Sequence, residues 1–272
     1  MDSRHLSLMD FMNKGEQNIV DLADRFNEFE QDMFARRHVN YRRVSLTGSA
    51  PVMRVIDPYD GFEREMIYFA SNDYLNLTRH PRTIEAGRKA LEKYGTGAGS
   101  VPLLGGTLDI HIELEQKVAK FKGCEAALIF SSGFGSNAGA IAALLGEEGI
   151  PICDTLVHAS ILDGCIGKTV KFFRHNDMES LEKTLKRLED RKVTKLVMVD
   201  GVYSMDGDIA KLDEICEIAH RYGALVYVDE AHSTGVIGDT GRGTPEYYHL
   251  EGKVDIVAGT CSKALGVVGG FI

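Results

Sequence analysis

The sequence predicts an α/β fold built on a mostly parallel sheet, and three observations lead to this prediction. From residue 126 onward, short apolar runs recur along the chain, and amphipathic helical patterns lie between several of them. This alternation, at this spacing, is typical of parallel strands whose two faces are covered by helices. Polar and Gly-rich segments follow the runs, at the strand ends where such sheets bind ligands.

The N-terminal part of the chain has a different pattern. Residues from about 17 to 37 carry an apolar stripe among acidic residues, which predicts a helix whose apolar face needs a partner, such as a second subunit. Short alternating segments with turn residues between them follow and predict a small hairpin layer. These segments are residues 44–46, 52–56 and 66–69. We therefore assign residues 1–75 to an N-terminal helix and hairpin segment, and residues 76–272 to a large domain.

The large domain begins with helices and continues with alternating strands and helices. Pro81 suits the first turn of a helix that runs to about Tyr94, and a Gly-rich loop over 95–106 leads to a second helix over about 108–121. Later apolar runs predict strands, and amphipathic patterns predict further helices. The strands are expected at 126–130, 150–153, 170–173, 196–199, 225–228 and 256–258, and the helices at 178–191 and 212–222.

Composition limits the classes of function. The 272 residues carry a formal net charge of −9, which argues against nucleic acid or an anionic membrane as the main partner. No apolar run approaches a membrane span, and the start of the chain lacks a signal-peptide core. The five cysteines are scattered without a CxxC pair, which indicates reduced thiols in a cytoplasmic protein and no metal site. Because the sequence stops inside a strand-like stretch, we expect it to be a fragment.

A lysine close to the end of the chain is the first catalytic candidate. Lys263 stands among small and hydroxyl-bearing residues directly after an apolar run. A lysine amine reacts with an aldehyde only when it is neutral, so it needs a site that lowers its pKa. Thr260 and Ser262 offer hydroxyls to a phosphate. We expect Lys263 to carry pyridoxal 5'-phosphate (PLP) as a Schiff base; the alternative is a surface lysine in a Gly-rich turn.

An acid and a histidine follow the strand expected at 225–228. An acid at the end of a buried strand is costly unless a cation meets it, and a protonated pyridine nitrogen would meet Asp229 in that way. His232, three residues later, suits a hydrogen bond to the phenolic oxygen of the same ring. The alternative is that Asp229 caps a helix.

Three further polar segments follow other strands. His158 is placed to stack on a planar cofactor, although a buried histidine with satisfied hydrogen bonds is the commoner outcome. Gly133 and Phe134 open a helix, where free backbone N–H groups bind phosphate. Ser204, in the Asp- and Gly-rich run 200–208, is placed to reach a cofactor oxygen or a substrate. Ordinary turns would explain both Gly-rich segments equally well.

Four ordered motifs resemble those of the α-oxoamine synthases, a branch of the fold-type I, aspartate aminotransferase-like PLP enzymes. The likeness covers about residue 20 to the end. It implies the large PLP-binding domain of that fold, in a homodimer with its sites at the subunit boundary, and with the smaller C-terminal domain missing here. The motifs are Ser71-Asn72-Asp73-Tyr74-Leu75, His-Ala-Ser-Ile-Leu-Asp-Gly at 158–164, Asp-Glu-Ala-His at 229–232 and Gly-Thr-Cys-Ser-Lys-Ala-Leu-Gly at 259–266.

The resemblance implies roles for the four catalytic candidates. Lys263 would be the Schiff-base lysine and proton shuttle, and Asp229 would pair with the pyridine nitrogen. His158 would stack on the ring face. His232 would contact the phenolic oxygen, together with the cofactor-binding Ser204.

The same resemblance implies how the phosphate and the substrate are held. The backbone at Gly133 and Phe134 would hold the phosphate together with the hydroxyls of Thr260 and Ser262. Asn72 would lie near the substrate carboxylate. Related enzymes often carry an arginine near the position of Pro102, so contacts from the loop over 95–106 differ in this chain.

The implied reaction condenses an amino acid with an acyl-CoA, releases carbon dioxide and leaves an α-amino ketone. Within the family, the segment 105–109 favours the glycine acetyltransferase or serine palmitoyltransferase branches over 8-amino-7-oxononanoate synthase. Because the missing domain supplies an arginine that grips the substrate carboxylate, we expect the 272-residue fragment alone to be inactive or weak.

Other functions stay open at this point. A PLP-dependent aminotransferase or amino-acid lyase would show a similar cofactor site. A P-loop ATPase is a remote alternative, since the segment 164–169 looks like a phosphate loop, but two residues separate its glycines where four are needed. A scaffold piece that serves only dimerisation would not bind PLP at all.

Overall fold

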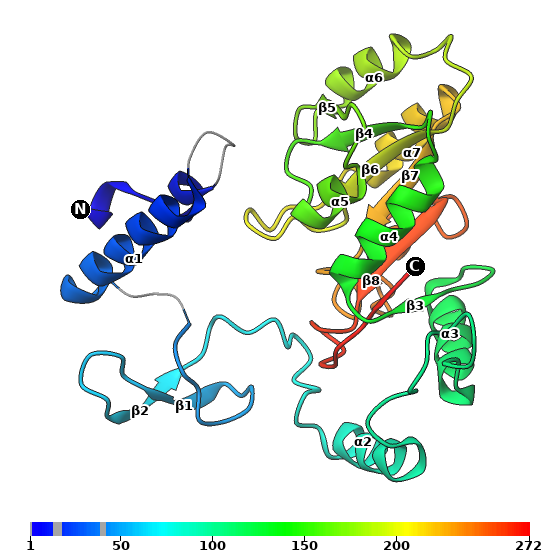
Figure 1. Ribbon diagram of the computed structural model, residues 1–272. Helices are drawn as coiled ribbons and strands as arrows, with labels where there is room; N and C mark the ends of the chain where they lie inside the picture. The colour runs from blue at the N-terminus through cyan, green and yellow to red at the C-terminus, as the bar shows by residue number, and fades with distance from the viewer. Residues whose placement is uncertain (1, 13–17, 39–41) are drawn as a thin grey trace. The chain divides into compact units, whose positions relative to one another are not determined.

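The computed structural model describes residues 2–12, 18–38 and 42–272. The chain divides into two compact units, Met1–Ala70 and Ser71–Ile272 (Figure 1). The functional division predicted at residue 75 stays a prediction. No helix in the described ranges combines the length and the apolar composition needed to cross a membrane.

The N-terminal unit holds the predicted helix and hairpin. Helix α1 is capped by Asn18, whose side-chain oxygen accepts from the backbone N–H of Val20 at 2.9 Å. Its apolar face buries Phe29, and the ring of Phe11 packs on Phe29 at 4.9 Å, so part of this face is covered from within the unit. The elements are η1 (Ser3–His5), η2 (Leu8–Phe11), α1 (Ile19–Ala35), β1 (Val52–Ile56) and β2 (Glu63–Ile67).

The hairpin differs from the prediction in two places. Strands β1 and β2 are antiparallel and pair Val52 with Ile67, so the second strand lies at 63–67 and not at 66–69. The turn that joins them fixes this register through the hydrogen bond from Asp57 N to Phe62 O, 2.9 Å long. The segment 44–46 is no strand and contributes one bridge, between Ser45 and Val55.

The larger unit contains the predicted sheet, which has seven strands. Their order is β3-β9-β8-β7-β6-β4-β5, with β4 to β8 mutually parallel and β9 antiparallel to both of its neighbours. The mostly parallel α/β fold is therefore confirmed. The strands are β3 (Ile129–Phe130), β4 (Ile150–Asp154), β5 (Lys171–Phe173), β6 (Lys195–Asp200), β7 (Leu225–Asp229), β8 (Ile256–Thr260) and β9 (Gly270–Phe271).

The helices of this unit follow the sequence prediction closely. Pro81 occupies the first turn of α2, where its missing N–H costs nothing. Helix α6 ends at Lys186 and not at 191, because tight turns follow it, the first closed by Leu188 N donating to Leu185 O at 2.9 Å. The helices are α2 (Pro81–Tyr94), α3 (Asp109–Lys122), α4 (Gly133–Leu145), α5 (Ala159–Gly164), α6 (Met178–Lys186), α7 (Leu212–Arg221) and α8 (Thr244–Tyr247).

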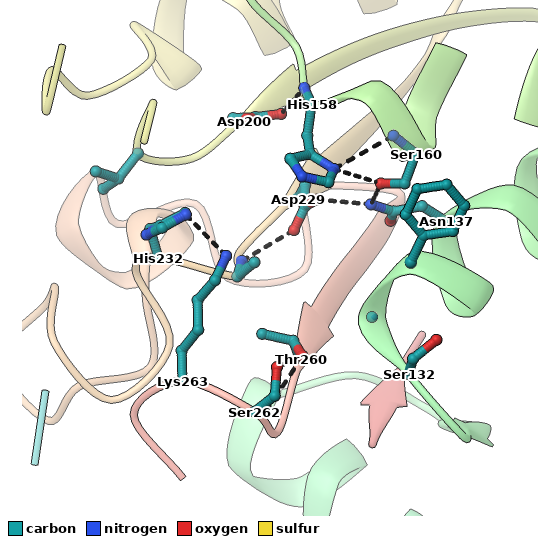
Figure 2. A pocket seen from close by; sticks show the side chains of 14 residues that line it. Ser132, Asn137, His158, Ser160, Asp200, Asp229, His232, Thr260, Ser262 and Lys263 are labelled. Atoms are coloured by element: carbon teal, nitrogen blue, oxygen red, sulfur yellow. Dashed lines mark hydrogen bonds between the residues drawn. The ribbon is translucent and has the colours of Figure 1, made fainter. Parts of the chain in front are cut away.

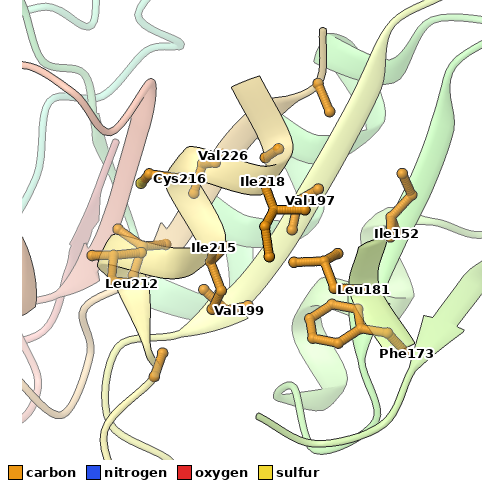
Figure 3. Close-up of a cluster of buried hydrophobic side chains, with 14 of the residues drawn as sticks. Ile152, Phe173, Leu181, Val197, Val199, Leu212, Ile215, Cys216, Ile218 and Val226 are labelled. Atoms are coloured by element: carbon orange, nitrogen blue, oxygen red, sulfur yellow. The ribbon is translucent and has the colours of Figure 1, made fainter. Parts of the chain in front are cut away.

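Two apolar layers cover the sheet, one on each face. Along β6, Val197 and Val199 face the layer that holds Leu181 of α6 and Ile215 of α7 (Figure 3). Leu196 and Met198, one residue out of phase, face the other layer, which contains side chains of α4 and α5. Because successive residues of a strand point to opposite faces, the middle of β6, residues 196–199, must be apolar at every position to be buried on both sides. Burying one such side chain contributes about 1.5–3 kcal/mol.

Polar residues appear where the parallel strands end. Strands β4, β6, β7 and β8 finish with Asp154, Asp200, Asp229 and Thr260, and all four residues are buried. Because the carboxyl ends of parallel strands meet at one edge of the sheet, these side chains gather there. The remote P-loop alternative is wrong, since the Gly-Lys-Thr run leads into strand β5, which begins at Lys171, and does not open a helix.

Candidate active site

A pocket of about 250 Å³ opens at the carboxyl ends of β6, β7 and β8 (Figure 2). It brings together all but two of the site residues predicted from the sequence. Those that line it are Gly133, Phe134, His158, Asp229, His232, Thr260, Ser262 and Lys263.

Lys263 and His232 face each other across one side of this pocket. Lys263 Nζ lies 2.7 Å from His232 Nε2, and His232 Nδ1 lies 2.7 Å from the hydroxyl of Tyr74. Burial lowers the pKa of Lys263, although the charges of Asp229 and Asp200 oppose this shift. Burial and the neighbouring Lys263 lower the pKa of His232 to about 4. The site therefore holds a neutral imidazole beside an amine that is easier to deprotonate than a surface lysine.

Asp229 is held as a hydrogen-bond acceptor at the end of β7. Its Oδ2 accepts from the side-chain amide of Asn137 at 2.6 Å, and its Oδ1 accepts from the backbone N–H of Ala231 at 2.9 Å. Asn137 also donates to Ser160 Oγ at 2.9 Å and accepts from the hydroxyl of Tyr227 at 2.7 Å. With every polar atom of Asn137 engaged, the carboxylate is fixed in place, and its remaining lone pairs are available to a cation in the pocket.

His158 is positioned by the start of α5. Its Nδ1 accepts from the backbone N–H of Ser160 at 3.2 Å and lies 2.7 Å from the hydroxyl of the same residue. The imidazole thus serves as the cap of α5, and its ring contacts Phe134 edge-on at a centroid distance of 6.4 Å. The hydrogen bonds to Ser160 and the edge-on contact with Phe134 limit the rotation of the His158 imidazole, which lines the pocket.

The N-terminus of α4 and the end of β8 form a second side of the pocket. Ser132 caps α4 by accepting from Gly135 N at 2.9 Å. The first N–H groups of a helix have no carbonyl partners within it, so those at the start of α4 can bind a ligand. A Cβ on Gly133 would lie 2.7 Å from Thr260 Cβ, so only glycine permits this approach. Thr260 Oγ1 in turn lies 2.8 Å from Ser262 Oγ. Backbone donors and hydroxyls converge here as an oxyanion such as phosphate requires.

Two predicted residues lie elsewhere. Ser204 is exposed and does not line the pocket. Asn72 is exposed as well, and its Oδ1 accepts from the hydroxyl of Tyr74 at 3.2 Å, so it is linked to His232 through Tyr74. The predicted contact of Ser204 with a cofactor oxygen stays a prediction, as does the role of Asn72 at a substrate carboxylate.

Several pocket residues were not singled out in the sequence. The sequence motifs assign no role to Asn137 or Ser160, and the turn-like composition of the run 200–208 accounts for Asp200. Asp200 ends β6 as the register partner of Asp229, which ends β7. A signal was present, since an acid directly after a fully apolar run is as unusual at 200 as at 229. Tyr74 belongs to a recognised motif, but nothing local connects it to a histidine 158 positions later.

The pocket suits a planar ligand with an aldehyde, a ring cation and a phosphate. Lys263 provides the amine, Asp229 provides the buried carboxylate, and the start of α4 with Thr260 provides the phosphate cradle. These are the groups that PLP needs from a protein. The fit rests on Gly133 in particular, because a side chain there would fill the cradle.

Comparison with known proteins agrees with this chemistry. A family model described as Aminotransferase class I and II matches residues 64–272. An 8-amino-7-oxononanoate synthase from Thermoanaerobacter pseudethanolicus is 47% identical over 234 residues, which are 85% of this chain and 58% of that protein. One from Bacillus pumilus is 47% identical over 212 residues, 77% of this chain and 54% of that protein. The chain spans a little over half the length of these relatives.

Solved structures show the same likeness. A serine palmitoyltransferase from S. paucimobilis, with a bound PLP–myriocin aldimine, matches with a TM-score of 0.85 and 38% identity over 94% of this chain and 63% of that chain. An 8-amino-7-oxononanoate synthase from Francisella tularensis matches with a TM-score of 0.61 and 30% identity over 75% of this chain and 56% of that chain. The curated relatives above do not support the preference, drawn from the segment 105–109, for other branches over 8-amino-7-oxononanoate synthase.

Proposed function

Because the chain belongs to the aminotransferase class I and II family, in its α-oxoamine synthase branch, we propose that it binds PLP through Lys263 and condenses an amino acid with an acyl-CoA. Carbon dioxide and free CoA leave, and an α-amino ketone is formed. The observation that carries this proposal is the placement of Lys263, whose Nζ lies in the same pocket as the buried Asp229 and the phosphate cradle of α4.

When bound, PLP supplies the electron sink for bond breaking at the α-carbon of the amino acid. Asp229 would hold the ring nitrogen of the cofactor through its carboxylate and would keep that nitrogen protonated. Asn137 and the backbone N–H of Ala231 donate hydrogen bonds to the Asp229 carboxylate. These bonds fix its orientation, so it needs no reorganisation when the ligand enters. His158 offers its ring to one face of the ligand.

Lys263 moves the proton at the α-carbon. A neutral amine has the lone pair that this step needs, and burial lowers the pKa of Lys263 toward the neutral form. The same amine is hydrogen-bonded to His232. The single hydroxyl proton of Tyr74 goes to Asn72 Oδ1, so Tyr74 accepts from Nδ1–H of His232, and the unprotonated Nε2 accepts from Nζ of Lys263. This contact holds Nζ at the pocket.

The phosphate side of the pocket sets the position of the ligand. The free N–H groups at Gly133 and Phe134 carry the positive end of the α4 dipole, which favours a phosphate dianion. Thr260 and Ser262 add hydroxyl groups directly beside this helix end. A phosphate held at this end would keep the bound ligand beside Lys263 while substrates exchange.

The finer assignments rest on the relatives. We place the activity with the 8-amino-7-oxononanoate synthases and serine palmitoyltransferases, in a cytoplasmic homodimer. The free thiols of the five cysteines support a reducing compartment. The apolar side chains that α1 leaves exposed, Ile19 and Val20 among them, support a partner subunit.

An assay on the full-length protein tests this function. Protein loaded with PLP is supplied with glycine, serine or alanine and with acyl-CoAs of increasing chain length, and CoA and carbon dioxide are measured. We expect both products in equal amounts with one amino acid, and their loss in Lys263→Ala but not in Lys117→Ala, a change at an exposed lysine of α3. Amino-group transfer to a 2-oxo acid without CoA release would instead indicate an aminotransferase.

A further inference from the structure

Asp200 is a buried acid of the pocket to which neither the sequence motifs nor the proposed mechanism gives a task. It ends β6, directly beside β7, and its Cα is the register partner of the Cα of Asp229. Both side chains line the pocket, and both residues are nearly buried, with 5% and 6% of their surface exposed. Two carboxylates this close in a buried site repel each other when both are ionised.

The hydrogen bonds around the two acids are unequal. Asp229 accepts a short bond from the amide of Asn137 and another from the N–H of Ala231. Among the described residues, the side chain of Asp200 accepts one bond, from the backbone N–H of His158 at 3.2 Å. Donors stabilise the charged form of a carboxyl group, so the negative charge belongs on Asp229 and the proton belongs on Asp200.

The other charged groups near Asp200 do not remove the preference of Asp200 for its protonated form. Asp154 on β4 adds a further negative charge, and Lys263 after β8 is the nearby cation that acts on Asp200. Burial and then the charge of Asp229 raise the pKa of Asp200 well above its ordinary value, in spite of Lys263 and of the bond from His158. Burial also lowers the pKa of Lys263, which weakens its opposing positive charge.

We propose that Asp200 is a further functional residue of this pocket: a carboxylic acid that keeps its proton at neutral pH and offers it as a hydrogen-bond donor to an oxygen of the bound ligand. The two acids then divide their work, since Asp229 accepts from the ring cation and Asp200 donates to an oxygen. The proposal rests on the proposed function only for the identity of that ligand.

Infrared spectroscopy tests the protonation state without any cofactor. The full-length protein, free of PLP, is compared at neutral pH with Asp200→Asn, which has the shape and donor ability of the protonated acid. We expect the difference spectrum to contain the carbonyl stretch of a protonated carboxyl group that the variant lacks. In Asp229→Asn this stretch should disappear at a lower pH, because the repelling charge is gone. Absence of the stretch from the wild-type protein at neutral pH would overturn the proposal.

PLP binding tests the donor role separately. Asp200→Asn should bind PLP within about threefold of the wild type, because it keeps the donor, whereas Asp200→Leu should bind about tenfold more weakly, as expected for the loss of one buried hydrogen bond. Equal losses in both variants would contradict a donor role. If either variant fails to fold, a pH titration of the Asp200 carboxyl by carbon-13 NMR in the wild-type protein decides the protonation state. Failure of the wild type to bind PLP would contradict the proposed function and leave the infrared result standing.

Discussion

Two clusters at the same edge of the sheet use the same residue types in opposite ways. In the first, His175 lies between two acids, with Nδ1 at 3.0 Å from Asp154 and Nε2 at 2.7 Å from Asp208. In the second, the pocket, His232 lies beside Lys263. Burial alone would lower the pKa of His175, but the hydrogen bonds and charges of the two acids raise it. The pKa of His232 falls to about 4.

The contrast between the two histidines shows how one scaffold separates stability from chemistry. Both nitrogens of His175 face carboxylates, so it is the charged centre of a set of hydrogen bonds that ties β4 to the loop after Val202. In the pocket, no cationic side chain of the described residues is bonded to Asp229, and the amine of Lys263 is poorly stabilised as a cation. A ligand that carries a positive ring nitrogen and an aldehyde completes the second cluster.

Removing the unpaired acid of the pocket should have the largest effect. Asp229→Asn leaves a ring cation buried without its counter-charge, and breaking such a pair costs about 3–5 kcal/mol. PLP affinity, measured by equilibrium titration of the full-length protein, should fall by about 10²- to 10⁴-fold. The matched change Asp239→Asn, at an exposed acid, should leave the affinity unchanged. Similar affinities for both variants would mean that Asp229 does not face the ring nitrogen.

Removing the charged histidine should weaken the fold without touching the pocket. His175→Gln leaves the buried Asp154 without its cation and should lower the free energy of unfolding by about 2–3 kcal/mol. His220→Gln is the control, because its ion pair with Asp255 is largely exposed and such pairs contribute about 0–1 kcal/mol. Chemical denaturation measures both. A loss for His175→Gln no larger than the control would show that the cluster contributes little.

Filling the phosphate cradle should have a smaller, local effect. Gly133→Ala places a Cβ against Thr260 and should weaken PLP binding by about tenfold, as overpacking of about 1–3 kcal/mol implies. Gly139→Ala, two turns further along the same helix, meets only Phe130 at 3.7 Å and should bind PLP normally. If the first variant binds as tightly as the second, the phosphate lies elsewhere.

The smallest effects should appear in the pH dependence of stability, with opposite signs for the two histidines. Because folding raises the pKa of His175, protonation of this histidine stabilises the folded protein. This stabilisation is complete below about pH 6.5, the pKa of a histidine in the unfolded chain, and is lost as the pH rises through the pKa in the folded protein. The lowered pKa of His232 costs stability as the pH falls from about 6.5 to about 4, because the unfolded chain takes up the proton first.

Denaturation curves of His175→Gln and His232→Asn between pH 4 and pH 9 check these signs. The first variant should differ most from the wild type in acid and approach it in alkali. The second should lose less stability than the wild type as the pH falls. The same slope for both variants would remove the contrast between the clusters.

The sequence predicted the pocket because its residues follow the ends of predicted strands. It could not predict the hydrogen bonds between the side chains of the pocket. Asp229, His232 and Lys263 meet because parallel strands end at one edge, a rule that needs only the order of apolar runs. Asn137 meets Asp229 because α4 packs across the end of β7, and the two residues lie 92 positions apart. The pairing of Asp200 with Asp229 depends on the register between β6 and β7, which no local pattern encodes.

The most direct test of this account is to locate the covalent bond between the protein and PLP. The full-length protein is incubated with PLP, the bond is fixed with borohydride, and the modified peptide is identified by mass spectrometry. Burial in the pocket and the lowered pKa of Lys263 predict a pyridoxyl group on Lys263. A label on another lysine, or no label at all, would contradict the account.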